Sequence, residues 1–196
     1  MQGIRTRDVT ALILCGGAGA RMGGADKPLL AHRGAPMVQR VLQAMRLHVS
    51  EVLISANRNI DTYETLAPVV TDAPRPSQGP LTGVLRAMET TRRDWLWVCP
   101  GDAPHLHGEL LSRLVEQTPQ ARVVTAHDGT RDQWLHMLVH ISLRTSLTEY
   151  LDADGYSVHR WLHSLPNGTH QTVGCPDIAS SFLNINEAKD LEGETP

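Results

Sequence analysis

The sequence predicts an α/β protein built on a mostly parallel central sheet. Residues 11–15 form a continuous apolar run that leads directly into glycine-rich sequence, and such a run is typical of a buried parallel strand. Apolar residues at helical spacing over 38–49 precede a second short apolar run at 51–55. A strand, a helix and a strand in this order form a βαβ unit with a right-handed crossover. A further apolar run at 95–99 predicts another central strand.

The segment 16–27 carries the most specific chemical pattern in the chain. Glycines at positions 16, 17, 19, 23 and 24 let the backbone adopt positive φ and approach a ligand closely. Backbone amides in such a loop cradle phosphate groups, and Arg21 and Lys27 add two positive charges. An ordinary glycine-rich surface turn is the alternative, and the density of these features argues against it.

Two well-known phosphate-binding loops do not fit this segment. The P-loop needs a serine or threonine after its lysine, whereas Pro28 follows Lys27. The dinucleotide-binding fingerprint needs a third glycine at the position of Met22. Since Pro28 also disfavours helical geometry at the residue before it, we expect Lys27 on an extended segment that reaches back toward the loop.

A long signature in this segment resembles that of the molybdenum cofactor guanylyltransferases, the MobA family of nucleotidyltransferases. The resemblance implies a single-domain, Rossmann-like three-layer sandwich over residues 1–196. In it, 1–102 would form the nucleotide-binding half, 103–191 the acceptor-binding half and 192–196 a tail. It also implies that Arg21 and Lys27 are catalytic. The matching residues are Leu14-x-Gly16-Gly17-x-x-x-Arg21-Met22-Gly23-Gly24-x-Asp26-Lys27, of which Leu14, Cys15, Gly16, Gly17 and Lys27 would bind the nucleotide.

Further nucleotide-binding residues are expected beyond the carboxyl ends of the next strands, where ligands bind in open α/β sheets. Asn57 follows the strand at 51–55, and Asp72 follows a brief strand at 68–71. An asparagine serving a turn would be the preferred interpretation of Asn57 without the resemblance. A loop rich in proline and glycine, 74–83, precedes the next helix. The resemblance places Pro80, Leu81 and Gly83 of that loop, together with Asn57 and Asp72, against the nucleotide.

Asp102 is the predicted metal ligand. It follows the strand at 95–99 and lies between Pro100-Gly101 and Pro104. Magnesium prefers carboxylate and phosphate oxygens and needs only one or two protein ligands. In the resemblance Asp102 is the metal-binding aspartate, and it is catalytic and nucleotide-binding as well. The alternative is a cap for the helix expected at 109–117, but the gap is long for a cap.

The resemblance implies an acceptor site in the second half of the chain. Its residues would be His127, Asp128 and Arg131, between strands expected at 121–126 and 137–141, and Asn184 and Asn186, in a strand expected at 181–186. The sequence departs from the family pattern at two places, Trp134-Leu135 and Glu187-Ala188.

Helices are expected at 144–151 and 157–165. The second carries His159 and His163, four residues apart. Two histidines with no carboxylate between them are weak evidence for a metal site, so we interpret them as a solvated helix face.

Composition narrows the class of protein. The net charge is −3 and the chain has no basic block, which argues against a nucleic-acid partner. No apolar run is long enough to span a membrane, and residues 1–9 lack the apolar core of a signal peptide. Three scattered cysteines favour reduced thiols in a cytoplasm over a disulfide framework. We expect a cytoplasmic monomer.

The resemblance implies a reaction in which the terminal phosphate of molybdopterin attacks GTP. GMP is transferred, pyrophosphate leaves, and Mg²⁺ is the cofactor. Transient contacts with other molybdenum cofactor biosynthesis proteins or with acceptor molybdoenzymes would follow. Two alternatives stay open: a cytidylyltransferase of the same fold acting on the same or another phosphorylated acceptor, and a non-catalytic module that binds nucleotide and cofactor for delivery.

Overall fold

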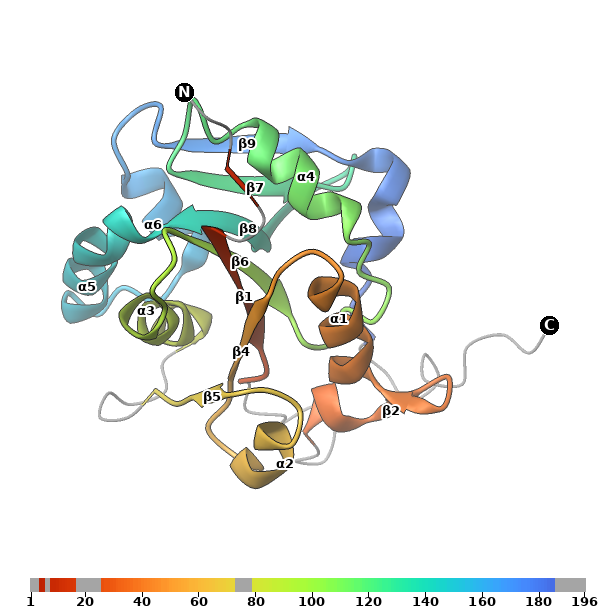
Figure 1. Cartoon of the computed structure of the whole chain (residues 1–196). Helices are drawn as coiled ribbons and strands as arrows, with labels where there is room; N and C mark the ends of the chain where they lie inside the picture. The colour runs from red at the N-terminus through yellow and green to blue at the C-terminus, as the bar shows by residue number, and fades with distance from the viewer. Residues whose placement is uncertain (1–3, 6–7, 17–25, 73–78, 186–196) are drawn as a thin grey trace.

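A seven-stranded sheet runs through the computed structural model, which describes residues 4–5, 8–16, 26–72 and 79–185 (Figure 1). The strand order is β5-β4-β1-β6-β8-β7-β9, and β8 alone among these strands runs antiparallel to its neighbours. The prediction of an α/β fold on a mostly parallel sheet is therefore confirmed. The strands are β1 (Val9–Leu14), β4 (Glu51–Ser55), β5 (Val69–Val70), β6 (Trp95–Pro100), β7 (Val123–His127), β8 (Asp132–His140) and β9 (His170–Gly174).

Helices cover both faces of the sheet and complete a three-layer sandwich (Figure 1). Alternate residues of β1 enter different apolar clusters: Ile13 packs on the side of α1 and α4, and Leu12 on the side of α3, α5 and α6. This alternation follows from the two-residue period of a strand. The helices are α1 (Met37–Arg46), α2 (Ile60–Glu64), α3 (Pro80–Thr90), α4 (Glu109–Glu116), α5 (Arg144–Asp152) and α6 (Val158–Ser164).

The first crossover follows the apolar spacing of its sequence. The buried residues of α1 recur at helical intervals, so one stripe of this helix faces the sheet. The helix begins at Met37, directly after β3 (Ala35–Pro36), which forms a small hairpin with β2 (Ala31–His32). The turn of this hairpin has positive φ at Arg33 and Gly34.

The carboxyl-terminal part differs most from the sequence prediction. The expected strand at 181–186 is wrong for its described residues, because a 3-10 helix, η5 (Pro176–Phe182), runs into it. Pro176 at the start of η5 has a fixed φ compatible with a helical turn. The last strand of the sheet is instead β9, which pairs in parallel with β7 and has no fully buried residue. None of the described helices is long and apolar enough to cross a lipid bilayer.

Candidate nucleotide-transfer site

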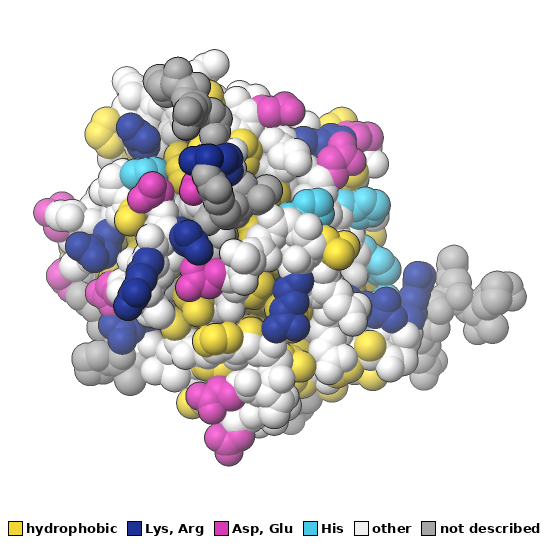
Figure 2. All heavy atoms as spheres, viewed as in Figure 1, with side chains coloured by type: hydrophobic (Ala, Val, Ile, Leu, Met, Phe, Trp, Pro, Cys, Tyr) yellow, Lys and Arg dark blue, Asp and Glu magenta, His cyan; other side chains and the backbone are white. Residues whose placement is uncertain are grey.

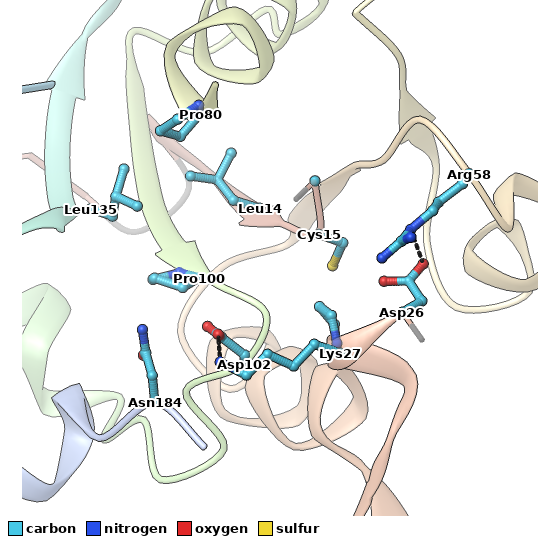
Figure 3. Close-up of a pocket in the computed structure, with 12 residues that line it drawn as sticks. Leu14, Cys15, Asp26, Lys27, Arg58, Pro80, Pro100, Asp102, Leu135 and Asn184 are labelled. Carbon is cyan, nitrogen blue, oxygen red and sulfur yellow. Dashed lines mark hydrogen bonds and ion pairs between the residues drawn. The ribbon is translucent and has the colours of Figure 1, made fainter. Parts of the chain in front are cut away.

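The carboxyl ends of four parallel strands meet at one edge of the sheet. Leu14 ends β1, and Asn57, Asp72 and Asp102 each lie two residues beyond β4, β5 and β6. A cavity of about 260 Å³ opens at this edge (Figure 3), as expected for a ligand site in an open α/β sheet. Its lining consists of Leu14, Cys15, Gly16, Asp26, Lys27, Pro28, Arg58, Pro80, Pro100, Asp102, Leu135 and Asn184.

Lys27 and Asp102 meet across the floor of this cavity. The Lys27 Nζ donates to Asp102 Oδ2 over 2.5 Å, and each side chain is 19% exposed. The predicted extended conformation at Lys27 is wrong: Lys27 begins a single 3-10 turn, η3 (Lys27–Leu29). Pro28 fits there because the first helical positions need no backbone N–H donor. Asp26, just before it, is extended.

The carboxylate of Asp102 fits the predicted magnesium site. Among the described residues no group of three histidine, cysteine or carboxylate side chains is arranged to hold a metal ion. A single carboxylate on a cavity wall is the arrangement that suits Mg²⁺ held largely by substrate phosphates and water, not by an all-protein cage.

Close packing at Gly101 sets the position of Asp102. The Gly101 N–H donates to Leu14 O over 2.9 Å, so the loop after β6 lies directly on the end of β1. A methyl group at Gly101 would stand 2.7 Å from Cys15 Sγ and 3.2 Å from Pro28 Cβ. Only glycine therefore lets this loop approach closely enough for Asp102 to reach Lys27.

Asn57 and Asp72 bind each other behind the cavity. Asn57 Nδ2 donates to Asp72 Oδ2 over 2.7 Å, and the Asp72 N–H donates to Asn57 Oδ1 over 2.9 Å. This reciprocal pair joins the ends of β4 and β5. Neither residue lines the cavity formed by the described part of the chain, so their predicted contacts with the nucleotide stay a prediction.

The segment around Pro80 is helical, contrary to the predicted loop. Pro80 is the first residue of α3, lines the cavity and, like Pro28, suits the first turn of a helix. Leu81 is buried in the core. Gly83 allows α3 to pack on β4, because a Cβ there would lie 2.2 Å from Ser55 Oγ. Leu81 and Gly83 thus have structural roles, and only Pro80 of the three reaches the cavity.

Gly16 lines the cavity without needing the conformational freedom of glycine. Its φ is not positive, so the expectation of a left-handed backbone is wrong at this position. A Cβ at Gly16 would find its nearest neighbour, Asn57 Nδ2, at 4.0 Å. The described residues thus leave that space open. Gly17 and Arg21 of the same segment lie outside the described residues.

The acceptor residues predicted from the sequence are not gathered in one place. Asn184 lines the cavity, and the neighbouring Ile185 N–H donates to Asp102 O over 3.2 Å. His127 ends β7, whereas Asp128 and Arg131 lie in the turn between β7 and β8, away from the residues that line the cavity. Asn186 lies outside the described residues.

Asp128 holds the β7–β8 turn together. Its Oδ1 accepts hydrogen bonds from Thr130 N, Thr130 Oγ1 and Arg131 N, and its Oδ2 accepts one from Gln133 Nε2. These bonds, that of the Thr130 side chain foremost, lower the pKa of the Asp128 carboxyl. The side chain is thus already saturated with donors of its own turn, and its predicted acceptor contact stays a prediction.

Comparisons with known proteins identify the family of the chain. A family profile described as a MobA-like NTP transferase domain matches residues 11–169. The chain belongs to this family. It is 38% identical to a molybdenum cofactor guanylyltransferase of Cupriavidus metallidurans, with 94% of this chain and 93% of the relative aligned. It is 35% identical to one of Shewanella piezotolerans, over 92% of this chain and 89% of the relative.

A solved structure shows that the fold is shared as well. Molybdopterin-guanine dinucleotide biosynthesis protein A from Archaeoglobus fulgidus superposes with a TM-score of 0.76 at 18% identity. The superposition covers 93% of this chain and 95% of that protein. The Rossmann-like three-layer architecture implied by the sequence resemblance is therefore confirmed for this member of the MobA-like family.

Sequence reasoning missed five residues that line the cavity of this family member. Asp26 and Arg58 form an ion pair, with Arg58 Nε 3.6 Å from Asp26 Oδ2 (Figure 3). Pro28 and Pro100 add apolar walls, and Leu135 projects from β8. Asp26 and Pro28 flank the predicted Lys27, so proximity in sequence could have found them. Arg58 and Leu135 reach the cavity only through the fold.

The remaining reactive side chains do not form a second catalytic centre in the described structure. Burial raises the pKa of the Cys15 thiol, which argues against a thiolate nucleophile at the cavity. All three cysteines are buried and unpaired. His159 and His163 are exposed, as expected, and their rings pack edge-on to Trp134 with centroids 5.2 and 5.9 Å away.

Proposed function

We propose that this protein transfers GMP from GTP to the terminal phosphate of molybdopterin and releases pyrophosphate. The observation that carries this proposal is the Lys27–Asp102 pair in a cavity at the carboxyl ends of the parallel strands. The supporting context is membership of the MobA-like family and relatives named molybdenum cofactor guanylyltransferase over nearly the whole chain.

The proposed chemistry matches what the cavity offers. A phosphate nucleophile is already anionic at neutral pH, so it needs no strong general base, and no buried histidine or activated thiol reaches the cavity from the described residues. The main barrier is repulsion between an anionic attacking group and a polyanionic nucleotide. Positive charges and in-line positioning lower that barrier. Lys27, together with Arg21 from the glycine-rich segment, would supply the charge.

Asp102 would hold a divalent cation, and we propose Mg²⁺. When bound, this ion would neutralise charge on the phosphates of the nucleotide. In the described structure Lys27 occupies one oxygen of Asp102. Lys27 neutralises Asp102 in this arrangement, and both side chains line the cavity that would hold the phosphates of the nucleotide.

The fold alone does not decide the nucleotide. A 4-diphosphocytidyl-2C-methyl-D-erythritol synthase from Anaerococcus prevotii superposes with a TM-score of 0.72 at 10% identity, over 95% of this chain and 96% of that protein. The cytidylyltransferase alternative therefore shares the architecture. The GTP proposal is supported by the names of the relatives and by the space that the described residues leave beside Gly16, because a purine needs more room than a pyrimidine.

A direct assay tests the proposal. Purified protein is incubated with molybdopterin and with either GTP or CTP, and pyrophosphate and the dinucleotide product are measured with and without Mg²⁺. We expect transfer from GTP in preference to CTP. Lys27→Ala and Asp102→Asn should each lower turnover by about 10²-fold or more, the loss typical of a removed charge-stabilising group, and both variants should still fold. Binding of GTP without any pyrophosphate release would favour the delivery-module alternative.

We further propose that the protein works in the cytoplasm as a monomer, in contact with GTP, molybdopterin and, transiently, other proteins of cofactor biosynthesis or acceptor molybdoenzymes. On the face shown in Figure 2, lysine and arginine side chains are interspersed with aspartate and glutamate. This mixture supports a small-molecule substrate over a nucleic acid, which would need a continuous basic patch. Light scattering of the purified protein tests the monomeric state.

A further inference from the structure

A buried carboxylate stands beside the cavity, next to the catalytic Lys27. The Asp26 side chain is only 4% exposed, although it carries a charge. Its Oδ2 accepts a hydrogen bond from Asn59 Nδ2 over 2.8 Å and lies 3.6 Å from Arg58 Nε. Both partners come from the loop after β4, so Asp26 ties the beginning of η3 to a distant part of the chain.

The backbone at Asn59 has an uncommon conformation. Asn59 precedes α2 with a φ of 50°, in the left-handed region, where side chains other than glycine are rare and asparagine is tolerated best. Its side chain does not cap α2, which is the usual use of an asparagine at that position. It binds Asp26 instead, so an uncommon conformation serves the contact between the two loops.

The same short loop also reaches the other side of the site. Asn57 binds Asp72 at the end of β5 through two hydrogen bonds, whereas Arg58 and Asn59 bind Asp26. Residues 57–59 thus connect the segment behind the cavity to the segment that carries Lys27. In Figure 3 Arg58 and Asp26 lie at the far side of Lys27 from Asp102. Lys27 therefore has an acidic residue on each side: its own side chain binds Asp102, and the preceding residue, Asp26, binds Arg58 and Asn59.

A bare carboxylate at Asp26 would oppose the proposed reaction. It lines the same cavity as Lys27, and a negative charge there would repel nucleotide phosphates in a partly water-excluded site. The guanidinium of Arg58 offsets that charge, and the amide of Asn59 satisfies one of its oxygens. The Arg58 side chain is 36% exposed, whereas the Asp26 carboxylate is buried, so removal of Arg58 would leave a buried charge uncompensated.

We propose that Asp26 is a positioning residue for nucleotide transfer: it fixes the start of η3 so that Lys27 faces the cavity, and Arg58 acts through Asp26 by neutralising it. This inference rests on the proposed function, because the phosphates that Lys27 and Arg58 would accommodate are those of the nucleotide. It assigns Arg58 no direct contact with the substrate.

Three variants test the proposal through GTP affinity and turnover. Arg58→Met removes the neutralising charge and should raise both the Kd for GTP, measured by calorimetry, and the KM about tenfold or more, with a smaller change in kcat. The Asp26→Asn/Arg58→Met double variant should regain most of that affinity, because no bare carboxylate is left. Asp26→Ala removes the anchor itself and should lower kcat about tenfold. If Arg58 and Asp26 acted independently, the double variant would not recover its affinity for GTP.

A surface ion pair supplies the matched control. Arg93 Nε lies 3.9 Å from Glu51 Oε2, at the opposite end of β4, and both side chains are about 40% exposed. Arg93→Met and Glu51→Gln should leave GTP affinity and turnover unchanged, since exposed pairs contribute little.

The other possible results of these measurements also test the proposal. A double variant no better than Arg58→Met would overturn the proposal, because Arg58 would then act without Asp26. The proposal would also be overturned if losses of GTP affinity and turnover merely followed lowered unfolding temperatures. Wild-type kinetics in both Arg58→Met and Asp26→Ala would overturn it too. Failure of the wild type to transfer GMP would instead remove the proposed function. The Kd values of the variants for GTP and for CTP, measured without acceptor, would then still test the coupling between Arg58 and Asp26.

Discussion

Replacing Gly101 by alanine should displace the loop after β6, which carries Asp102, without changing a charged group. Gly101 is the residue before Asp102 and donates to Leu14 O. A methyl group there would stand 2.7 Å from Cys15 Sγ, 3.2 Å from Pro28 Cβ and 3.3 Å from Ile13 Cγ2. Three sides of the space are thus occupied by side chains at the base of the cavity.

The size of the effect follows from these distances. Non-bonded heavy atoms pack at about 3.5–4.0 Å, so the loop or its neighbours must move by about 1 Å. Overpacking of this kind costs about 1–3 kcal/mol of folding stability. A shift of about 1 Å at a residue next to the reacting groups lowers turnover by as much as about 10²-fold. We expect Gly101→Ala to fold, to unfold at a lower temperature and to transfer GMP poorly.

Thermal unfolding and GTP-dependent pyrophosphate release measure the two effects. Gly174→Ala is the matched control, because a Cβ at Gly174 meets nothing within 4 Å. The Cys15→Ala/Gly101→Ala double variant, compared with Cys15→Ala alone, should regain part of both losses, since the closest contact is with the sulfur. Wild-type stability and turnover in Gly101→Ala would refute the claim that close packing positions Asp102.

Three further predictions follow from neighbouring features. Gly16→Ala should fold normally, because its Cβ would lie 4.0 Å from the nearest atom of the described residues, yet it should lower kcat/KM for GTP while hardly changing that for CTP. Equal losses with both nucleotides in competition kinetics would contradict the assignment of this space to the purine. Asn184→Ala should weaken acceptor binding more than GTP binding, by about 1–3 kcal/mol if a buried partner is stranded, and separate titrations of the two substrates check this. Burial lowers the pKa of His136 from 6.5 to about 3 in the folded protein. Between these pH values the unfolded chain binds one more proton than the folded protein does. The free energy of unfolding should therefore fall as pH drops from about 6.5 toward 3, by up to about 1.4 kcal/mol per pH unit. Urea unfolding of wild type and His136→Leu across this range tests it, and an identical pH slope in both proteins would count against His136 as the cause.

The parallel half of the fold could be predicted because its signals are local. A continuous aliphatic run predicts a buried strand wherever it occurs, and β1, β4 and β6 all appear within about two residues of their predicted ranges. The strand β9 could not be found this way. It is an edge strand with no fully buried residue, so its sequence carries neither alternation nor an apolar run. Its place is set by pairing with β7, which is a tertiary contact.

The candidate site likewise contains residues that local motifs predict and residues that only the fold brings to the cavity. Lys27 and Asp102 were predicted from separate motifs, and the fold brings their charged atoms to 2.5 Å. Arg58 lies in no recognisable motif and becomes relevant only because Asp26 stands opposite. Asp128 shows the reverse case: a residue singled out by a motif has donors of its own turn around both oxygens. A motif therefore predicts which chemistry is present, whereas the sheet decides which groups share a cavity.

The order of the sheet also suggests how the two substrates of the proposed reaction would meet beside Asp102. Asp102 follows β6, the strand where the parallel part of the sheet meets the antiparallel β8. On one side of it lie Leu14 and Lys27 from the first half of the chain, and on the other lie Leu135 and Asn184 from the second half. The hydrogen bond from Ile185 N to Asp102 O joins the two sides through backbone atoms. Side-chain substitutions at Asp102 or Asn184 leave those atoms in place. Activity lost in such variants would therefore report the chemistry of the side chain that was changed, because this link between the two halves of the cavity does not depend on it.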